Sequence, residues 1–289
     1  MRLLKILGAA LLLSYFMVGL AQAEKDSPVE TRIKKEKKVP ADSFAGTFYK
    51  PTYVLPYYYT GSPDNAVYQG HTPNGESIKH TELKYQLSFK VPLWKNIYQF
   101  PTSLYFAYTQ MSYWQVYNGS SFFRETDYEP ELFLANEIQW NLPRGWSINS
   151  LNLGITHQSN GVGGSLERSW NRIYLEAMSS VGDWMISVRP WYILHDGSLE
   201  NHNPNIGKFM GYGKVIAAYK YHHQVFSFAF NNFIESQMRR PTLELTWSIP
   251  ITAYLKVYTQ VFSGYGQSLI EYNHHTNSVG IGIAFSDWV

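Results

Sequence analysis

The sequence of 289 residues contains no cysteine and, beyond its first residues, no long hydrophobic run. The first absence excludes disulfides, thiol catalysis and thiolate metal sites. The second excludes transmembrane helices, which need about 20 consecutive apolar residues. A charge excess is also missing, because 24 Lys and Arg nearly balance 22 Asp and Glu. Aromatic residues are instead abundant, at 17% of the chain, with 23 Tyr and 9 Trp.

The N-terminal residues have the pattern of a secretory signal peptide. Arg2 and Lys5 precede an apolar stretch at residues 6–20, and residues 21–23 (Ala-Gln-Ala) form a small-residue cleavage site. We therefore predict a signal peptide at residues 1–23 and an exported mature chain. Without Arg2 and Lys5 the chain has 22 basic and 22 acidic residues. This neutral balance gives no reason to expect a nucleic-acid partner.

Alternation of apolar and polar residues recurs along the rest of the chain. Between residues 83 and 91 the odd positions are Leu, Tyr, Leu, Phe and Val, whereas Lys84, Gln86, Ser88 and Lys90 occupy the even positions. In an exported chain rich in aromatics, this period-two pattern indicates strands with one face toward lipid. A soluble sandwich would alternate too, so the number of strands and the lengths of their turns also matter. The twelve predicted strands span residues 48–60, 79–92, 103–116, 127–140, 145–159, 168–180, 183–195, 209–221, 224–234, 239–249, 253–264 and 275–287.

The connections between these strands alternate between tight turns and long loops. This alternation and an even strand number are typical of outer-membrane barrels whose termini lie in the periplasm. Closure of the barrel also gives every strand two hydrogen-bonding partners within lipid. We therefore predict an all-β fold, a twelve-stranded transmembrane antiparallel β-barrel at residues 48–289. The charged residues 24–47 show no periodicity and are interpreted as a periplasmic tail.

The predicted lumen of this barrel contains charges of both signs. The inward charged positions are Lys84, Lys90, Glu131, Arg172, Glu176, Arg189, Glu244 and Lys256. In a narrow barrel, such a mixture indicates a hydrogen-bonded plug and not an open pore.

Three polar residues interrupt the apolar, lipid-facing side of two neighbouring strands. From residue 151 the odd positions are Leu, Leu, Ile, His157 and Ser159, and on the next strand Asn171 shares its face with Ile173 and Leu175. Polar groups that face hydrocarbon are costly and usually functional. In the predicted topology all three lie near the extracellular end of the barrel.

Ser159, His157 and Asn171 are the residue types needed for acyl transfer. A histidine takes the proton from a serine hydroxyl as it attacks a carbonyl, and a third group orients the imidazole. A neutral asparagine suits a lipid-facing surface, where a charge would be costly. The His-x-Ser spacing alone would fit ordinary strand-end polar residues. The shared outward face favours the catalytic interpretation.

The segments around these residues resemble the outer membrane phospholipase A family. The resemblance rests on residues 157–161 (His-Gln-Ser-Asn-Gly) and 168–172 (Arg-Ser-Trp-Asn-Arg), supported by residues 50–56, 123–130 and 258–266. It implies a twelve-stranded outer-membrane barrel that hydrolyses phospholipid acyl esters, with A1, A2 and lysophospholipase activity, dependent on calcium and active as a homodimer. It also implies Ser159 as nucleophile, His157 as base and Asn171 as the residue that orients it. The Gly161 N–H, with a calcium-polarised water, then receives the oxyanion.

The same resemblance implies calcium ligands at Ser120, from across the dimer interface, and at Val162 and Glu167. The family usually has Arg in place of Val162, a change that a carbonyl ligand tolerates, and Ser in place of Glu167. It usually has an acidic ligand where this chain has His202, and only Glu200 lies close by. Because calcium prefers oxygen ligands, the metal site departs from the family pattern more than the triad does.

Two other functions fit parts of the sequence. A porin or non-catalytic barrel would keep the motif for structure alone, but the mixed-charge lumen and the outward His157, Ser159 and Asn171 argue against it. A secreted soluble esterase would not need the outward apolar faces. The sequence therefore favours a phospholipase of the bacterial outer membrane with its site on the barrel exterior.

Overall fold

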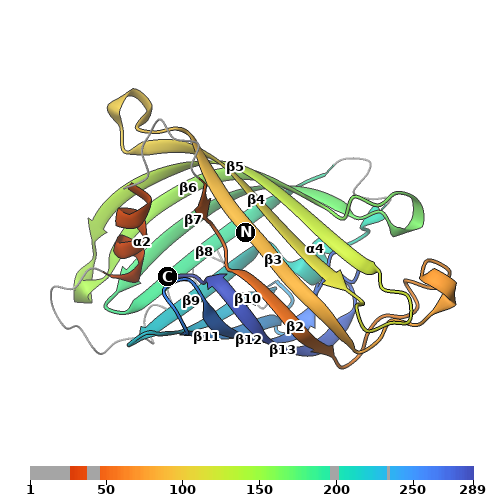
Figure 1. Ribbon diagram of the computed structural model, residues 1–289. Coiled ribbons are helices and arrows are strands. Elements are labelled where there is room, and N and C mark those ends of the chain that lie inside the picture. Colours follow the sequence, from red (N-terminus) through yellow and green to blue (C-terminus); the bar gives the residue numbers. More distant parts are fainter. Residues whose placement is uncertain (1–26, 38–45, 196–201, 233–234) are drawn as a thin grey trace.

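The computed structural model describes residues 27–37, 46–195, 202–232 and 235–289, and it shows a closed antiparallel β-barrel (Figure 1). The predicted fold of twelve long strands is confirmed. The long strands are β2 (Thr52–Thr60), β3 (Thr81–Trp94), β4 (Thr102–Trp114), β5 (Phe123–Asn141), β6 (Ser147–Ser159), β7 (Ser169–Val181), β8 (Trp184–Leu194), β9 (Gly213–Tyr221), β10 (Gln224–Asn231), β11 (Thr242–Pro250), β12 (Lys256–Tyr265) and β13 (His275–Ser286). The short elements are α2 (Pro28–Lys37), β1 (Thr47–Phe48), η1 (Pro73–Gly75), η2 (Ile97–Gln99), η3 (Pro143–Gly145), η4 (Gly164–Leu166) and α4 (Ile206–Met210). Within the described ranges no helix has the length and hydropathy needed to cross a membrane.

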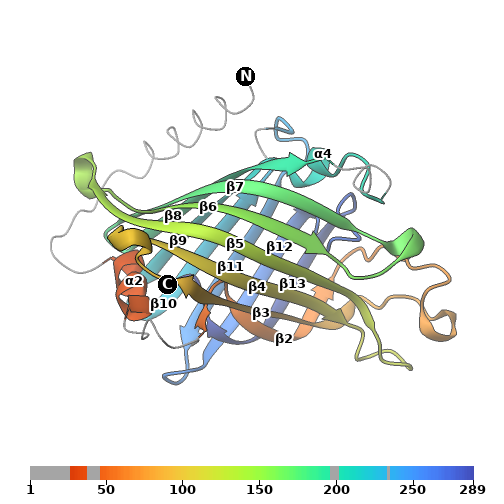
Figure 2. The ribbon, with the colours of Figure 1, turned by 90° about the horizontal axis from the view of Figure 1, so that it is seen from above.

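Each long strand pairs with the next one along the chain, and the pairing of β13 with β2 closes the barrel. Figure 2 shows β5, β6 and β7 side by side on one wall. The predicted strand ends agree with the structure within a few residues, with one clear exception. The segment predicted as strand from residue 209 begins as α4, and β9 starts only at Gly213. Gly211 ends this helix with a φ of 73°, a conformation that glycine adopts without strain.

The alternation in the sequence separates lumen from exterior as predicted. On β6, Leu153 and Ile155 are 49% and 46% exposed, whereas Asn152 and Thr156, which flank them in the sequence, are buried. A soluble protein would bury the apolar side, because that burial drives folding in water. The apolar exterior is therefore suited to contact with lipid, as the alternation predicted.

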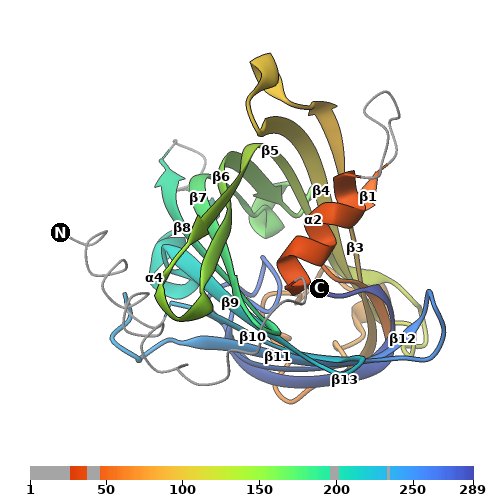
Figure 3. The same ribbon diagram turned by 90° about the vertical axis from the view of Figure 1, so that its left-hand side faces the viewer.

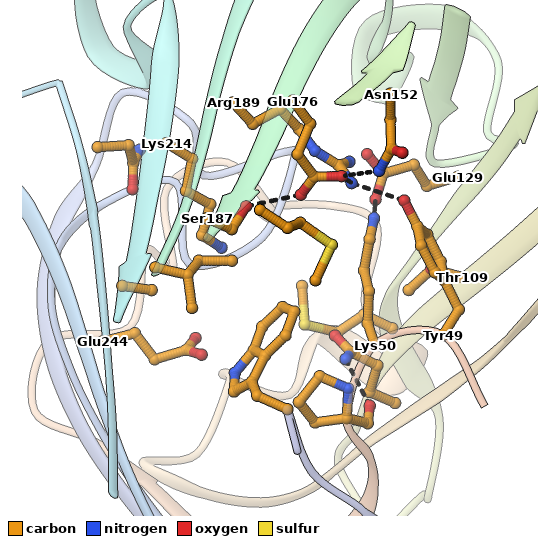
Figure 4. Close-up of a pocket in the computed structure, with 18 of the residues that line it drawn as sticks. Tyr49, Lys50, Thr109, Glu129, Asn152, Glu176, Ser187, Arg189, Lys214 and Glu244 are labelled. Atoms are coloured by element: carbon orange, nitrogen blue, oxygen red, sulfur yellow. Dashed lines mark hydrogen bonds and ion pairs between the residues drawn. The ribbon is translucent and has the colours of Figure 1, made fainter. Parts of the chain in front are cut away.

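The lumen is crossed by pairs of opposite charge. Lys50 reaches Glu129 at 2.8 Å, and Arg189 bridges Glu131 and Glu176 at 3.0 Å each. Figure 4 shows Lys50, Glu129, Glu176 and Arg189 beside a lumenal cavity of about 260 Å³. Lys214 and Glu244 lie on its other side. The predicted inward charges therefore face the lumen. The cavity lies inside the barrel wall and not at the outward-facing residues of β6 and β7.

A helix lies in the barrel mouth that carries the C-terminus, inside the segment interpreted as a tail (Figure 3). Ser27 and Glu30 form a capping box at its start, with Ser27 Oγ accepting from the Glu30 N–H and Glu30 Oε2 accepting from the Ser27 N–H. Val29 is fully buried among side chains of the lumen, and Arg32 donates to the Trp288 carbonyl. The sequence analysis did not predict this helix, because the segment PVETRIKKEK has few apolar residues and no clear periodicity. The predicted signal peptide and residues 24–26 and 38–45 of the tail lie outside the described residues.

The loop between β12 and β13 folds back into the opposite end of the lumen. Its Leu269 and Ile270 N–H groups donate to the Asp127 and Glu125 carboxylates, and Arg124 holds its Glu271 at 2.9 Å. Burial alone would raise the pKa of the Glu271 carboxyl, but the Arg124 guanidinium and the Ser268 hydroxyl bring that pKa below its ordinary value of 4.5. A carboxylate with a depressed pKa stabilises the folded loop above its unfolded pKa and loses this contribution as the pH falls through the folded value.

Acidification is therefore expected to release this loop. Amide exchange at Leu269 and Ile270, corrected for its intrinsic rate, should accelerate as the pH falls from about 6 to about 3. In Glu271→Gln the exchange should already be fast at the higher pH and change less. Equal protection of both proteins across this range would show that the Arg124–Glu271 pair does not hold the loop.

Candidate active site

Strands β6 and β7 bring His157 and Asn171 directly opposite one another. The pairing follows from the antiparallel register, in which Ser159 faces Ser169 and His157 faces Asn171. Asn171 Oδ1 lies 2.8 Å from His157 Nδ1 and accepts its hydrogen. The other ring nitrogen, Nε2, is then the unprotonated one in the neutral imidazole. The asparagine thus gives the histidine the tautomer that a general base requires.

The three predicted residues lie on the outside of the barrel. His157 is exposed, and Ile155 and Ile173 on the same face are 46% and 42% exposed. Their neighbours in sequence, Thr156 and Arg172, are buried on the lumenal side. A register shift of one residue would have exchanged these faces, so the placement agrees with the alternation in the sequence.

Gly161 supplies a hydrogen-bond donor beside Ser159. Its N–H donates to Ser159 Oγ at 3.0 Å, and its φ is 67°, in the left-handed region. A Cβ at this position would also come within 3.0 Å of the ring of Tyr128, the residue opposite Ser159 on β5. Both backbone conformation and space therefore favour glycine where the chain leaves β6.

The lumenal side of the same two strands is held by a layer of polar and aromatic side chains. Gln158 Oε1 accepts from Trp170 Nε1 at 2.8 Å and from Arg172 at 3.2 Å. The Arg172 guanidinium lies 4.0 Å from the Trp170 ring centroid and pairs with Glu129 at 2.7 Å. These residues line the lumenal cavity and therefore pack on the lumenal side of the two strands whose outer side carries His157 and Asn171.

The loop between β6 and β7 contains two of the three predicted calcium ligands, Val162 and Glu167. The Glu167 carboxylate lies 3.7 Å from His202 Nε2. The Glu167 and Ser165 carbonyls both accept from the Arg168 guanidinium, at 2.7 and 3.1 Å. Two backbone oxygens of this loop therefore point toward the same positive group. Backbone carbonyl oxygens are also ligands that calcium prefers.

Ser120 lies in the connection between β4 and β5 and makes other contacts. Its Oγ accepts from Asn74 at 3.0 Å, and its N–H donates to Glu76 at 3.1 Å. No group of three His, Cys, Asp or Glu side chains within the described ranges forms a metal cluster. A calcium site within these ranges would therefore need backbone oxygens or a second subunit to complete its ligand set. Glu200 lies outside the described residues.

The sequence analysis overlooked a polar group on the outer face of β4. Gln110 has the parity of the exposed Phe106, and it donates to Tyr85 Oη at 3.3 Å and to Ser112 Oγ at 3.2 Å. Tyr108 Oη in turn donates to Gln110 Oε1 at 3.0 Å. The signal in the sequence was a glutamine at an even position among aromatic residues. An amide on a lipid-facing surface marks this wall, two strands from β6, as unusual.

Comparisons with known proteins agree on one family. The family model described as Phospholipase A1 matches residues 29–285. The phospholipase A1 of Escherichia coli K12 is 39% identical over 218 residues, which are 73% of this chain and 72% of that protein. The solved structure of outer membrane phospholipase A from Escherichia coli superposes with a TM-score of 0.80 and 35% identity, covering 86% of this chain and 95% of that one. The Salmonella typhi outer membrane phospholipase, a dimer with bound calcium, gives a TM-score of 0.80 and 34% identity, with 87% and 96% coverage.

Proposed function

This chain belongs to the phospholipase A1 family of the bacterial outer membrane, and we propose that it cleaves glycerophospholipid acyl esters by a Ser159–His157–Asn171 mechanism that requires calcium and a second subunit. The observation that carries the mechanism is the 2.8 Å contact between His157 Nδ1 and Asn171 Oδ1 on the barrel exterior. The Gly161 N–H lies 3.0 Å from Ser159 Oγ on the same face. The site therefore opens directly toward the surface where phospholipid is found.

In the first half of the reaction, Ser159 Oγ attacks the carbonyl carbon of an acyl ester. His157 Nε2 takes the hydroxyl proton, and Asn171 keeps the imidazole in the required tautomer and orientation. The Gly161 N–H, which donates to the hydroxyl before substrate binds, is the nearest donor for the oxyanion. When the ester C–O bond breaks, the protonated His157 returns the proton to the leaving alcohol. The products of this half are an acylated Ser159 and a lysophospholipid.

In the second half, water replaces the alcohol. His157 removes a proton from the water as it attacks the acyl carbonyl, and the same proton returns to Ser159 Oγ when the acyl–serine bond breaks. A fatty acid leaves and the enzyme is restored. In both steps the nucleophile, the base and the Gly161 donor come from β6, β7 and the loop that joins them.

Calcium binding is proposed for the loop between β6 and β7. The Val162 carbonyl, Glu167 and Ser120 of a second copy would hold the ion, consistent with the bound calcium in the Salmonella typhi relative. There it would supply positive charge beside the developing oxyanion. Residue Glu167 carries a carboxylate that is 36% exposed and therefore accessible to a cation.

A second subunit is proposed because one barrel leaves the site without walls. His157 lies on a convex outer surface, and an acyl chain needs apolar walls on more than one side. The outward amide of Gln110 lies on the neighbouring wall, where an interface between copies would shield it from lipid. The relative from Salmonella typhi forms such a dimer.

The proposal is tested by detergent-refolded protein in phospholipid mixed micelles. We expect release of fatty acid with calcium, and none with a chelator. A sulfonyl fluoride probe should inactivate the enzyme by forming an ester with Ser159, identified by mass spectrometry of the labelled peptide. Hydrolysis that survives complete chelation, or a label on another residue, would refute the mechanism.

Asn171→Ala is expected to reduce kcat about ten- to hundredfold, which is less than the full contribution of a general base, about 10²- to 10⁴-fold. His157 remains present, but its tautomer and tilt are no longer held. Initial rates at saturating calcium measure the effect. Asn277→Ala is the matched control, because Asn277 is also an exposed asparagine with a cross-strand contact, to Ser263 at 2.7 Å. Full activity of Asn171→Ala would remove the amide from the mechanism.

A further inference from the structure

We propose that Asn160 is a positioning residue of the active site, whose side chain folds the loop between β6 and β7 so that the Gly161 N–H faces Ser159. This inference rests on the proposed function. Asn160 directly follows the last residue of β6, and only 3% of its surface is exposed. A buried polar side chain at the start of an otherwise exposed loop is held there by its hydrogen bonds.

The first contact of Asn160 shapes the chain just after Ser159. Its Oδ1 accepts from the Val162 N–H at 3.3 Å, which is the geometry of an Asx turn. Gly161 is the central residue of this turn and has a φ of 67°. The turn reverses the chain, and the Gly161 N–H then donates to Ser159 Oγ at 3.0 Å. The Asn160 side chain and the proposed oxyanion donor therefore belong to one local fold.

The remaining contacts tie this turn to the far limb of the loop. Asn160 Oδ1 also accepts from the Arg168 N–H at 3.0 Å, and Nδ2 donates to the Leu166 carbonyl at 2.8 Å. The Asn160 N–H donates to the Arg168 carbonyl at 3.0 Å and continues the ladder of β6 and β7. One side chain thus fixes both limbs, and with them the positions of Val162 and Glu167.

The barrel itself does not depend on these contacts. Strands β6 and β7 are paired from Ser147 opposite Ser180 to Ser159 opposite Ser169 before the loop begins. Loop residues 161–165 are all exposed, and such segments add little to global stability. The loss of Asn160 should therefore change the geometry of the oxyanion donor and leave the folded barrel in place.

Two variants separate positioning from stability. Asn160→Ala removes all side-chain contacts, and we expect kcat to fall about 10²-fold, as on loss of an oxyanion donor, with KM changed less. Asn160→Asp keeps the Oδ1 acceptor for the Val162 and Arg168 N–H groups but replaces the Nδ2 donor with an oxygen that faces the Leu166 carbonyl, so it should recover only part of kcat. Amide exchange at Val162 and Arg168 should be fast in the alanine variant and remain slow in the aspartate variant.

Asn149→Ala is the matched control. Asn149 lies at the other end of β6, is 2% exposed and accepts from Ser180 Oγ at 2.8 Å. We expect Asn149→Ala to lower the melting temperature while its kcat stays within about twofold of the wild type. The folded fraction of each variant is read from its heat-modified migration.

A wild-type kcat in Asn160→Ala would overturn the inference. So would a loss of activity that is proportional to the loss of folded protein, or an equal kcat in the alanine and aspartate variants. A wild-type protein that hydrolyses no phospholipid would refute the proposed function instead. In that case the amide exchange of Val162 and Arg168 still decides whether Asn160 folds the loop.

Discussion

Ser159→Ala is expected to reduce phospholipid hydrolysis about 10⁴- to 10⁶-fold, the range found when the nucleophile of a serine hydrolase is removed. Ser159 is the hydroxyl that accepts from the Gly161 N–H, and it shares its strand face with His157, so its loss removes the proposed nucleophile. Initial rates of fatty-acid release, at saturating calcium, measure the loss.

The folded barrel should survive this substitution. Ser159 Oγ accepts one hydrogen bond at the end of β6, and such a bond contributes about 1 kcal/mol to the free energy of unfolding. Ser263→Ala is the control, since Ser263 is also outward on its strand and bonded through Oγ, to Asn277. Both variants should show wild-type heat-modified migration, and only Ser159→Ala should lose activity. Near-normal turnover in folded Ser159→Ala would end the serine mechanism.

The outward face of the site was predictable because it depends on a local rule. Side chains alternate along a strand, so the apolar residues around His157 and Ser159 determined their side before any pairing was known. The contact of His157 with Asn171 required one further step, the register of a hairpin between two adjacent strands. Both inferences use short stretches of sequence, in which few alternatives exist.

The lumen was less predictable, because its partners are far apart in the sequence. Lys50 pairs with Glu129, 79 residues away, and Arg124 pairs with Glu271, 147 residues away. Alternation shows that such charges point inward, but the choice of partner depends on the closed barrel. The helix α2 was missed for a related reason, since its stability comes from packing of Val29 inside the lumen.

The role proposed for Asn160 also lay beyond the sequence pattern. Asn160 lies just beyond the predicted strand of residues 145–159, and the structure buries it. Its three side-chain hydrogen bonds arise only after the loop folds back between Ser159 and Ser169. Loop geometry of this kind depends on several backbone groups at once, so residue spacing alone does not determine it.

Removal of calcium is expected to lower hydrolysis to the background rate, and Glu167→Ala to raise the calcium concentration needed for half-maximal activity several-fold. As a proposed ligand, the Glu167 carboxylate would add a negative oxygen to a loop whose Ser165 and Glu167 carbonyls already accept from the Arg168 guanidinium. Turnover is measured against calcium concentration for both proteins, alongside the dimer fraction from crosslinking.

The control for this experiment is Asp183→Ala, which removes one acidic side chain from the turn between β7 and β8, at the other end of these strands. The calcium dependence of Asp183→Ala should match that of the wild type, because this variant changes the net charge by the same amount as Glu167→Ala but leaves the loop of Ser159 and Gly161 untouched.

In Glu167→Ala, the weaker calcium response should be accompanied by a lower dimer fraction at intermediate calcium, since Ser120 of the second copy is proposed to share the ion. Unfolding is not expected, because the Glu167 side chain is 36% exposed and lies 3.7 Å from His202 in a surface loop. Superimposable curves for Glu167→Ala and wild type would show that the carboxylate faces solvent and that carbonyl oxygens alone hold the ion.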